Sequence, residues 1–88
     1  TVDDRDYLRA MIPHHSLAIT RSERVAFDDV RACELAREIS IAQRVEIDEM
    51  TWLIDDIANA GAATSSADAE TRQIPEFNAT SPIRCGTP

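Results

Sequence analysis

Two stretches of the chain repeat apolar residues at helical spacing. At about 100° per residue, the apolar positions of each stretch gather on one arc of a helical wheel. The first arc contains Leu8, Met11, Ile12, Ala18, Ile19 and Ala26. The second arc contains Leu35, Ile39, Ala42, Met50, Leu53 and Ile57. This pattern predicts one helix over about residues 3–26 and a second helix over about residues 30–60.

Residues that favour helix ends support these limits. Asp3 or Asp4 can cap the first helix and Asp28 can cap the second, while Gly61 is typical of the position just past a helix end. Pro13 lies inside the first helix and has no backbone N–H. We therefore expect a kink or a restart there, which would free a backbone carbonyl beside the neighbouring histidines.

The short turn between the two predicted helices indicates an antiparallel hairpin. Beyond Gly61 the periodicity ends, and three of the four prolines follow. We divide the chain into a helical hairpin, residues 1–60, and an irregular C-terminal tail, residues 61–88, which is either disordered or laid along the helices. A lone hairpin leaves apolar surface exposed, so we expect a homodimer that completes an all-α four-helix bundle.

Composition excludes several classes of partner. The 88 residues suit one small domain, and the net charge of −7 argues against nucleic acid and anionic membrane surfaces, which require a basic patch. No apolar run approaches the roughly 20 residues that span a bilayer, so we expect no membrane insertion. The chain starts in acidic sequence. Either the protein is cytosolic, or a signal peptide or anchor is absent from the sequence shown.

The two cysteines, Cys33 and Cys85, are far apart and do not form a C-x-x-C motif. Metal-finger and thioredoxin chemistry are therefore not indicated. The pair is compatible with a single long-range disulfide, which would favour an oxidising compartment.

Two polar residues fall inside the apolar arcs. His15 lies between Met11 and Ile19, and Glu46 lies near the middle of the second arc. Burying an unpaired carboxylate costs several kcal/mol, so Glu46 needs a cation or a proton. His15 is the candidate partner, either directly or through a metal ion.

This pair has two interpretations. Histidine and glutamate on facing helices can form a buried hydrogen-bonded pair that only fixes the register. Alternatively, imidazole and the thioethers of Met11 and Met50 form a soft ligand set that suits copper, particularly Cu(I). His14 adjoins His15 at the border of the same face. Methionines at helical spacing are also common core residues, so the sequence leaves both interpretations open.

No catalytic constellation is recognisable. Ferritin-like di-metal sites use Glu-x-x-His on a helix, and no glutamate here is followed by histidine three residues later. Ser16 and Ser40 lack a triad-like setting. His15 with Glu46 could act as an acid–base pair, but nothing identifies a substrate pocket. We therefore predict that the protein is not an enzyme.

Two motifs together carry a resemblance to a known family. Met-x-x-His-His spans residues 11–15, and Gln-x-x-Glu-Ile-x-x-Met spans residues 43–50. With the Asp-Tyr-Leu-Arg-Ala segment at residues 6–10, they resemble the bacterial domain-of-unknown-function family number 305 over about residues 3–57. Members of that family are ferritin-like, helical and usually exported or membrane-anchored. Some relatives are linked to copper or silver binding in the periplasm.

The resemblance implies a metal site and a possible role. It nominates as ligands Met11, His14, His15, Glu46 and Met50, with Gln43 as a hydrogen-bonding group behind them. Longer relatives carry a second helical half with another His-His motif and Met-rich segments, which this chain lacks. High-capacity metal storage is therefore not expected, and a dimer partner's hairpin could replace the missing half.

The predicted function follows from these observations. We expect a small exported protein, secreted or in the cell envelope, that binds a soft transition metal, copper first, through the Met/His/Glu cluster. The alternative is a structural or protein-interaction module in which His15 and Glu46 form only a buried register-fixing pair.

Overall fold

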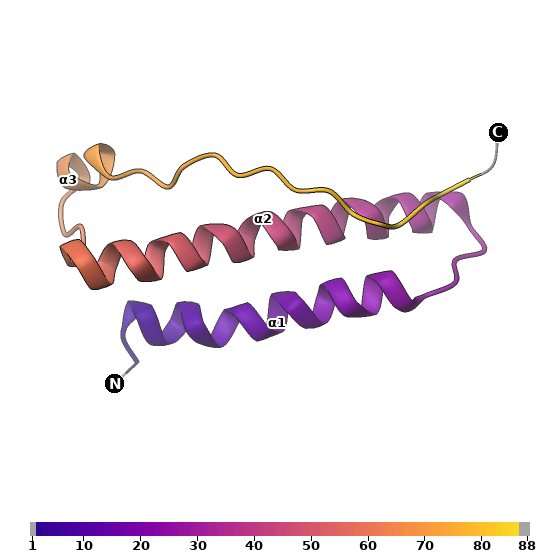
Figure 1. Ribbon diagram of the computed structural model, residues 1–88, viewed down its shortest axis with the longest axis horizontal. Helices are drawn as coiled ribbons and strands as arrows, with labels where there is room; N and C mark the ends of the chain where they lie inside the picture. Colours follow the sequence, from indigo (N-terminus) through magenta and orange to yellow (C-terminus); the bar gives the residue numbers. More distant parts are fainter. Residues whose placement is uncertain (1, 87–88) are drawn as a thin grey trace.

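A computed structural model describes residues 2–86 as three helices and an extended tail. The helices are α1, Asp4–Arg24, α2, Val30–Ala60, and α3, Ser66–Thr71. Figure 1 shows α1 and α2 side by side and antiparallel, with α3 beside the C-terminal end of α2. The predicted all-α class and the helical hairpin are confirmed for the described residues. None of the helices in residues 2–86 has the length and apolar character needed to cross a bilayer.

A reciprocal cap begins α1. The side chain of Asp3 accepts the Asp6 N–H at 2.8 Å, and the Asp6 carboxylate accepts the Asp3 N–H at 3.4 Å. The hydrogen bond from the Asp6 backbone lowers the pKa of Asp3. From there α1 runs without interruption through Pro13 to Arg24, so the chain does not restart at the proline. A proline deletes only one intrahelical hydrogen bond, and the remaining bonds sustain the helix.

The observed limits of α2 match the predicted ones. Gly61 follows the helix with φ of 78°, the left-handed region that glycine adopts without steric cost. The N-cap is Asp29 and not Asp28, so that prediction was wrong by one residue. Asp29 lies directly before the helix, where its carboxylate can accept the Arg31 N–H at 2.8 Å.

The core lies where α1 and α2 meet, but the face that α2 buries differs from the predicted one. Leu35 is 58% exposed and Ile39 is 40% exposed, and Ala42 is exposed as well. The face is rotated toward residues with smaller side chains, which allow close helix packing. The buried residues of α2 are Cys33, Ala36, Ser40 and Met50.

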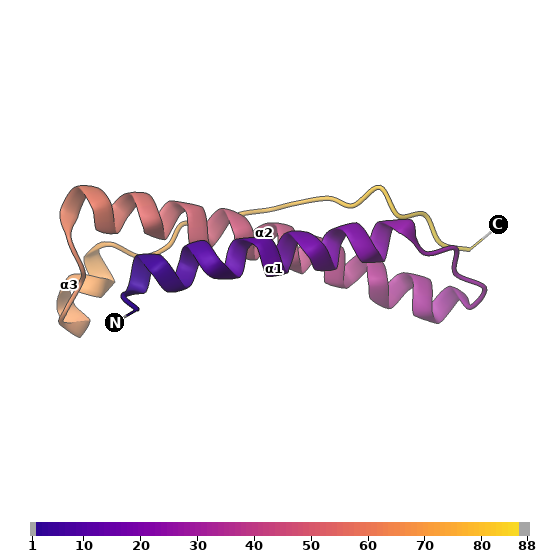
Figure 2. The same ribbon diagram turned by 90° about the horizontal axis from the view of Figure 1, so that it is seen from below.

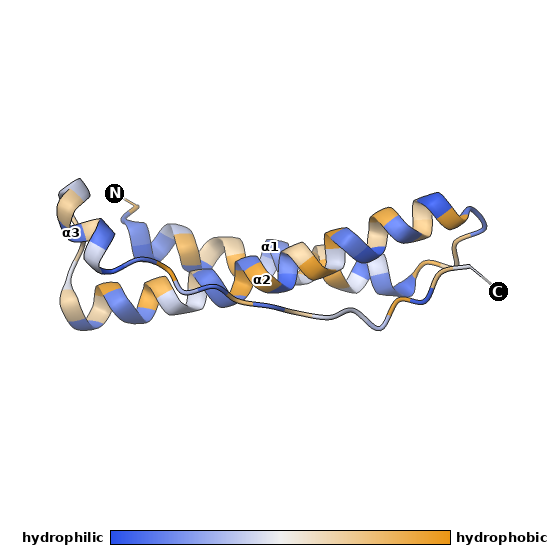
Figure 3. Ribbon diagram, turned by 90° about the horizontal axis from the view of Figure 1, so that it is seen from above, coloured by the Kyte–Doolittle hydropathy of each residue, from blue (hydrophilic) through white to orange (hydrophobic). Residues whose placement is uncertain are grey.

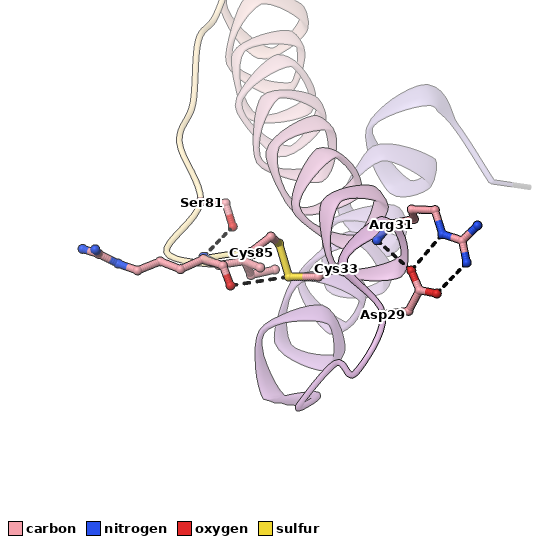
Figure 4. The surroundings of a disulfide bond; sticks show 7 residues. Asp29, Arg31, Cys33, Ser81 and Cys85 are labelled. Carbon is pink, nitrogen blue, oxygen red and sulfur yellow. Dashed lines mark hydrogen bonds and ion pairs between the residues drawn. A yellow bond between two sulfur atoms is a disulfide. The ribbon is translucent and has the colours of Figure 1, made fainter. Parts of the chain in front are cut away.

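The tail is laid along the helices, one of the two states that the sequence left open. It contains a short helix that the sequence did not predict, α3, which starts where Ser65 accepts the Asp68 N–H at 3.1 Å. Beyond α3 the chain is extended and follows α2 back toward the interhelical turn (Figures 1 and 2). A disulfide joins Cys85 to Cys33 in the first turns of α2, with 5.7 Å between the Cα atoms (Figure 4).

Arg72 holds the other end of the tail. Its Nη2 donates to Asp56 Oδ2 at 2.7 Å and to the Gly61 carbonyl, and its Nη1 donates to Asp68 Oδ2 at 3.1 Å. The hydrogen bond to Asp56 is the main reason that the pKa of Arg72 is raised. One guanidinium therefore ties the end of α2 to α3.

Candidate functional site

A shallow groove of about 290 Å³ opens between α1 and α2. We call it the Met–His groove, because both methionines of the chain and one of its two histidines line it. Four of the five predicted metal residues meet there: Met11, His15, Glu46 and Met50. The other lining residues are Tyr7, Leu8, Glu49, Leu53 and Ile74.

Two contacts orient the ring of His15. Its Nδ1 lies 2.9 Å from the Met11 carbonyl oxygen, one helical turn earlier. A carbonyl can only accept, so Nδ1 carries a proton and donates it. The other nitrogen, Nε2, lies 2.5 Å from Glu46 Oε2. Because two lone pairs would repel at that distance, one proton lies between these two atoms. The direct contact is the first of the two pairings that the sequence suggested.

Glu46 is less buried than its place on the helical wheel predicted. Its side chain is 48% exposed, whereas that of His15 is 16% exposed. The reason is the rotated packing face of α2, which leaves Glu46 at the solvent side of the groove. A carboxylate that keeps half its exposure avoids most of the desolvation cost, so its charge alone does not demand a metal ion.

The remaining predicted residues lie outside the groove. His14 is exposed and Gln43 is partly buried, and neither is among the lining residues. Adjacent residues on a helix point about 100° apart, so His14 and His15 cannot face the same groove equally.

The sequence alone did not place Glu49 or Ile74 in the groove. Glu49 lies three residues after Glu46, a helical spacing that could have placed both carboxylates on one face. Ile74 reaches the groove from the tail, whose path no local pattern reveals.

The donor atoms of the groove are of mixed character. Within residues 2–86, no three His, Cys, Asp or Glu side chains gather closely enough to hold a metal ion. The Met–His groove instead combines one imidazole, two carboxylates and the two thioethers, Met11 and Met50. A soft metal is the kind of ion that thioethers favour.

A second polar cluster also joins α1 to α2. Ser40 is fully buried, and its hydroxyl donates to Glu23 Oε1 at 3.4 Å. Arg44 pairs with the same carboxylate oxygen. The cluster gives the buried Ser40 hydroxyl a hydrogen-bond partner. Like the His15–Glu46 contact, it also helps to set the register of α1 against α2.

Comparisons with known proteins give a family and one partial relative. The family described as "Domain of unknown function (DUF305)" matches residues 2–80. A protein of Acanthamoeba polyphaga mimivirus, "Uncharacterized protein L153", is 46% identical over 57 residues, which cover 62% of this chain and 38% of that protein. The chain thus spans well under half the length of that relative. No solved structure matches significantly. The family match covers most of the chain, which therefore belongs to the DUF305 family.

Proposed function

We propose that the Met–His groove binds a soft transition metal, with Cu(I) as the first candidate. The ligands would be the thioethers of Met11 and Met50 and the Nε2 atom of His15. The observation that carries the proposal is that both methionines of the chain line the same groove as His15. Two neutral thioethers with an imidazole are a donor set that suits Cu(I).

The hydrogen bond between His15 and the Met11 carbonyl supports this assignment. Histidines that bind metals commonly donate their other ring N–H to a carbonyl or carboxylate, which fixes the tautomer. Here Nδ1 donates, so Nε2 is the atom left for a ligand bond. Glu46 now contacts Nε2. A metal ion would displace that contact, and Glu46 would then supply an oxygen ligand or a nearby negative charge.

We also propose an extracytoplasmic location, secreted or in the cell envelope. The Cys33–Cys85 disulfide supports it, because disulfides form and persist mainly in oxidising compartments. His14 lies outside the groove and is not needed in the minimal ligand set.

A structural or protein-interaction module is the second candidate function. It is favoured by the 2.5 Å contact between His15 and Glu46, which already satisfies both groups without a metal. With the Glu23–Arg44 pair, this contact would do no more than fix the register of α1 against α2.

A Cu(I) competition titration against a chromophoric chelator separates the two candidates. The test variant is Met11→Leu/Met50→Leu, which removes both thioethers and retains the side-chain volume and the His15–Glu46 contact. The control is His14→Gln, which changes the adjacent histidine outside the groove. We expect one Cu(I) per chain in the wild type and in the control. In the methionine variant, we expect affinity to fall by at least about tenfold.

Circular dichroism of all three proteins would show that the helices are intact. An absence of Cu(I) binding by the wild type, or equal affinity in the methionine variant, would reject the metal site. The structural module would then be the better account of the groove.

A further inference from the structure

Helix α2 carries two parallel seams, each with residues spaced alternately three and four apart. The first seam packs toward α1 and the tail and contains all four buried residues of α2. The second seam contains Leu35, Ile39, Ala42, Glu46, Glu49 and Leu53. Alternation of three and four is the spacing at which one helix packs against another in coiled coils and bundles. A helix with two such seams is therefore built to contact more than one neighbouring helix.

Helix α1 carries a seam of the same spacing beside the residues that face α2, and we call it the second seam of α1. It contains Tyr7, Met11, His14, Ala18, Arg21 and Val25. The second seams lie on the same side of the hairpin, because Tyr7 and Met11 of α1 line the Met–His groove together with Glu46, Glu49 and Leu53 of α2. We call the surface formed by the two second seams the open face.

Much of the open face is exposed to solvent along its length. Besides Leu35 and Ile39, Tyr7 is 58% exposed and Val25 is 53% exposed. The tail reaches this face at Ile74, which lines the Met–His groove, whereas farther along Ala79 and Thr80 lie beside Ile19 of α1 and Ile47 of α2. In Figure 3 apolar bands recur along both helices, while the tail crosses in front of α2 on its way from α3 to the C-terminal end. Large apolar side chains arranged in a seam and left exposed mark an interaction surface.

We propose that a second copy of this chain docks on the open face, so that two hairpins form a four-helix bundle around the Met–His groove. The charges of the face support a second copy as the occupant. On this face α1 contributes Arg21 and the imidazole of His14, whereas α2 contributes Glu46 and Glu49. A two-fold axis that places α1 of each copy over α2 of the other brings the Arg21 guanidinium and the ring nitrogens of His14 toward the carboxylates of the facing helix.

The second copy would also change the environment of the groove. Glu46 and Met11, which belong to the open face, would become enclosed between the two hairpins. A metal held by Met11, His15 and Met50 would then be shielded from solvent. This enclosure rests on the proposed metal site, whereas the docking itself does not.

Analytical ultracentrifugation of the intact, oxidised protein in the presence of a metal chelator tests the docking. We expect a mass of two 9.8 kDa chains for the wild type. Ile39→Asp places a charge in the open face at a half-exposed position of the hairpin. We expect it to raise the dimer dissociation constant by at least about tenfold. The matched control is Leu17→Asp, at a position that is 47% exposed but lies outside the open face, and this variant should remain dimeric.

Circular dichroism would show that both variants keep their helices. A single-chain mass for the wild type at every concentration, or an unchanged dimer in Ile39→Asp, overturns the proposal. The metal site is judged separately. A monomer that binds Cu(I) would refute the docking alone, and a dimer that binds none would refute the metal site alone.

Discussion

Hydrogen-bonded aspartates cap the first turns of α1 and α2, and Asp29 is the clearest case. Its side chain accepts from the Arg31 guanidinium at 2.7 and 3.1 Å and from the Arg31 backbone N–H at 2.8 Å. The guanidinium bonds, and then the backbone bonds, lower the pKa of Asp29 from 3.8 to about 2. A carboxylate whose pKa is lower in the folded state stabilises that state above its unfolded pKa. This contribution is lost as the pH falls toward the folded value.

We predict that Asp29→Ala lowers the melting temperature at neutral pH, because the first turn of α2 loses its cap. The difference from the wild type should shrink as the pH falls from about 4 to about 2, where Asp29 itself takes a proton. Thermal melts followed by circular dichroism across this pH range would measure it. Asp28→Ala is the matched control and should have little effect. A difference that is still undiminished at pH 2 would contradict the assignment of Asp29 as the cap.

For single residues, the sequence predicted which side chains pair more accurately than it predicted how deeply those side chains are buried. His15 and Glu46 are polar residues on two apolar arcs, and that placement was enough to pair them. The half-exposed position of Glu46 depends on which part of the α2 surface meets α1. The helix itself gives no signal for that choice, because the cap residues and the periodicity fix only its limits and its approximate face.

Among the elements, α2 shows what periodicity can and cannot specify. Its limits were predicted because aspartate before it and Gly61 after it have clear local roles. Its buried face was only partly predicted, because two adjacent seams share one broad apolar region. Small side chains at Ala36 and Ser40 decide the packing, yet a hydrophobicity pattern gives them little weight. α3 has six residues, too few for periodicity, although the Ser65 cap was a local signal.

Arg72 is the residue on which the position of α3 depends. We predict that Arg72→Ala speeds amide hydrogen exchange in residues 66–71 several-fold, because the ties to Asp56, Asp68 and the Gly61 carbonyl are lost together. Exchange in the middle of α2 should not change. The control is Arg84→Ala, which removes an exposed arginine elsewhere in the tail. Equal exchange rates in α3 for the wild type and Arg72→Ala would show that other contacts hold this helix.

For the molecule as a whole, the Cys33–Cys85 disulfide is the main long-range constraint. It joins positions 52 residues apart, and a cross-link of that length removes much of the conformational freedom of the unfolded chain. The extended segment before Cys85 has no regular secondary structure, so the bond fixes a segment that would otherwise be weakly held. The sequence could suggest the pairing but not the path of the tail, which only the three-dimensional arrangement determines.

We predict that removing this disulfide lowers the free energy of unfolding by about 2–4 kcal/mol. Urea unfolding of the oxidised wild type and of Cys33→Ala/Cys85→Ala would measure the difference, and the helical signal before unfolding should stay nearly constant. Reduction of the wild type with a dithiol should reproduce the effect of the variant. Equal stability of the oxidised and reduced proteins would show that the cross-link restrains a chain already held by other contacts.

The same bond also sets how the molecule would respond to mechanical tension. The cysteines close a covalent ring that contains most of α2, all of α3 and the extended tail, while α1 lies outside it. Force applied to the two chain ends is transmitted through the sulfur–sulfur bond. It does not act on the chain between Cys33 and Cys85, which lie 52 positions apart in the sequence. The chain therefore cannot lengthen by the roughly 180 Å that these residues would span if they were fully extended, at about 3.5 Å per residue. Under tension α1 would separate from α2, while the residues inside the ring would bear none of the force.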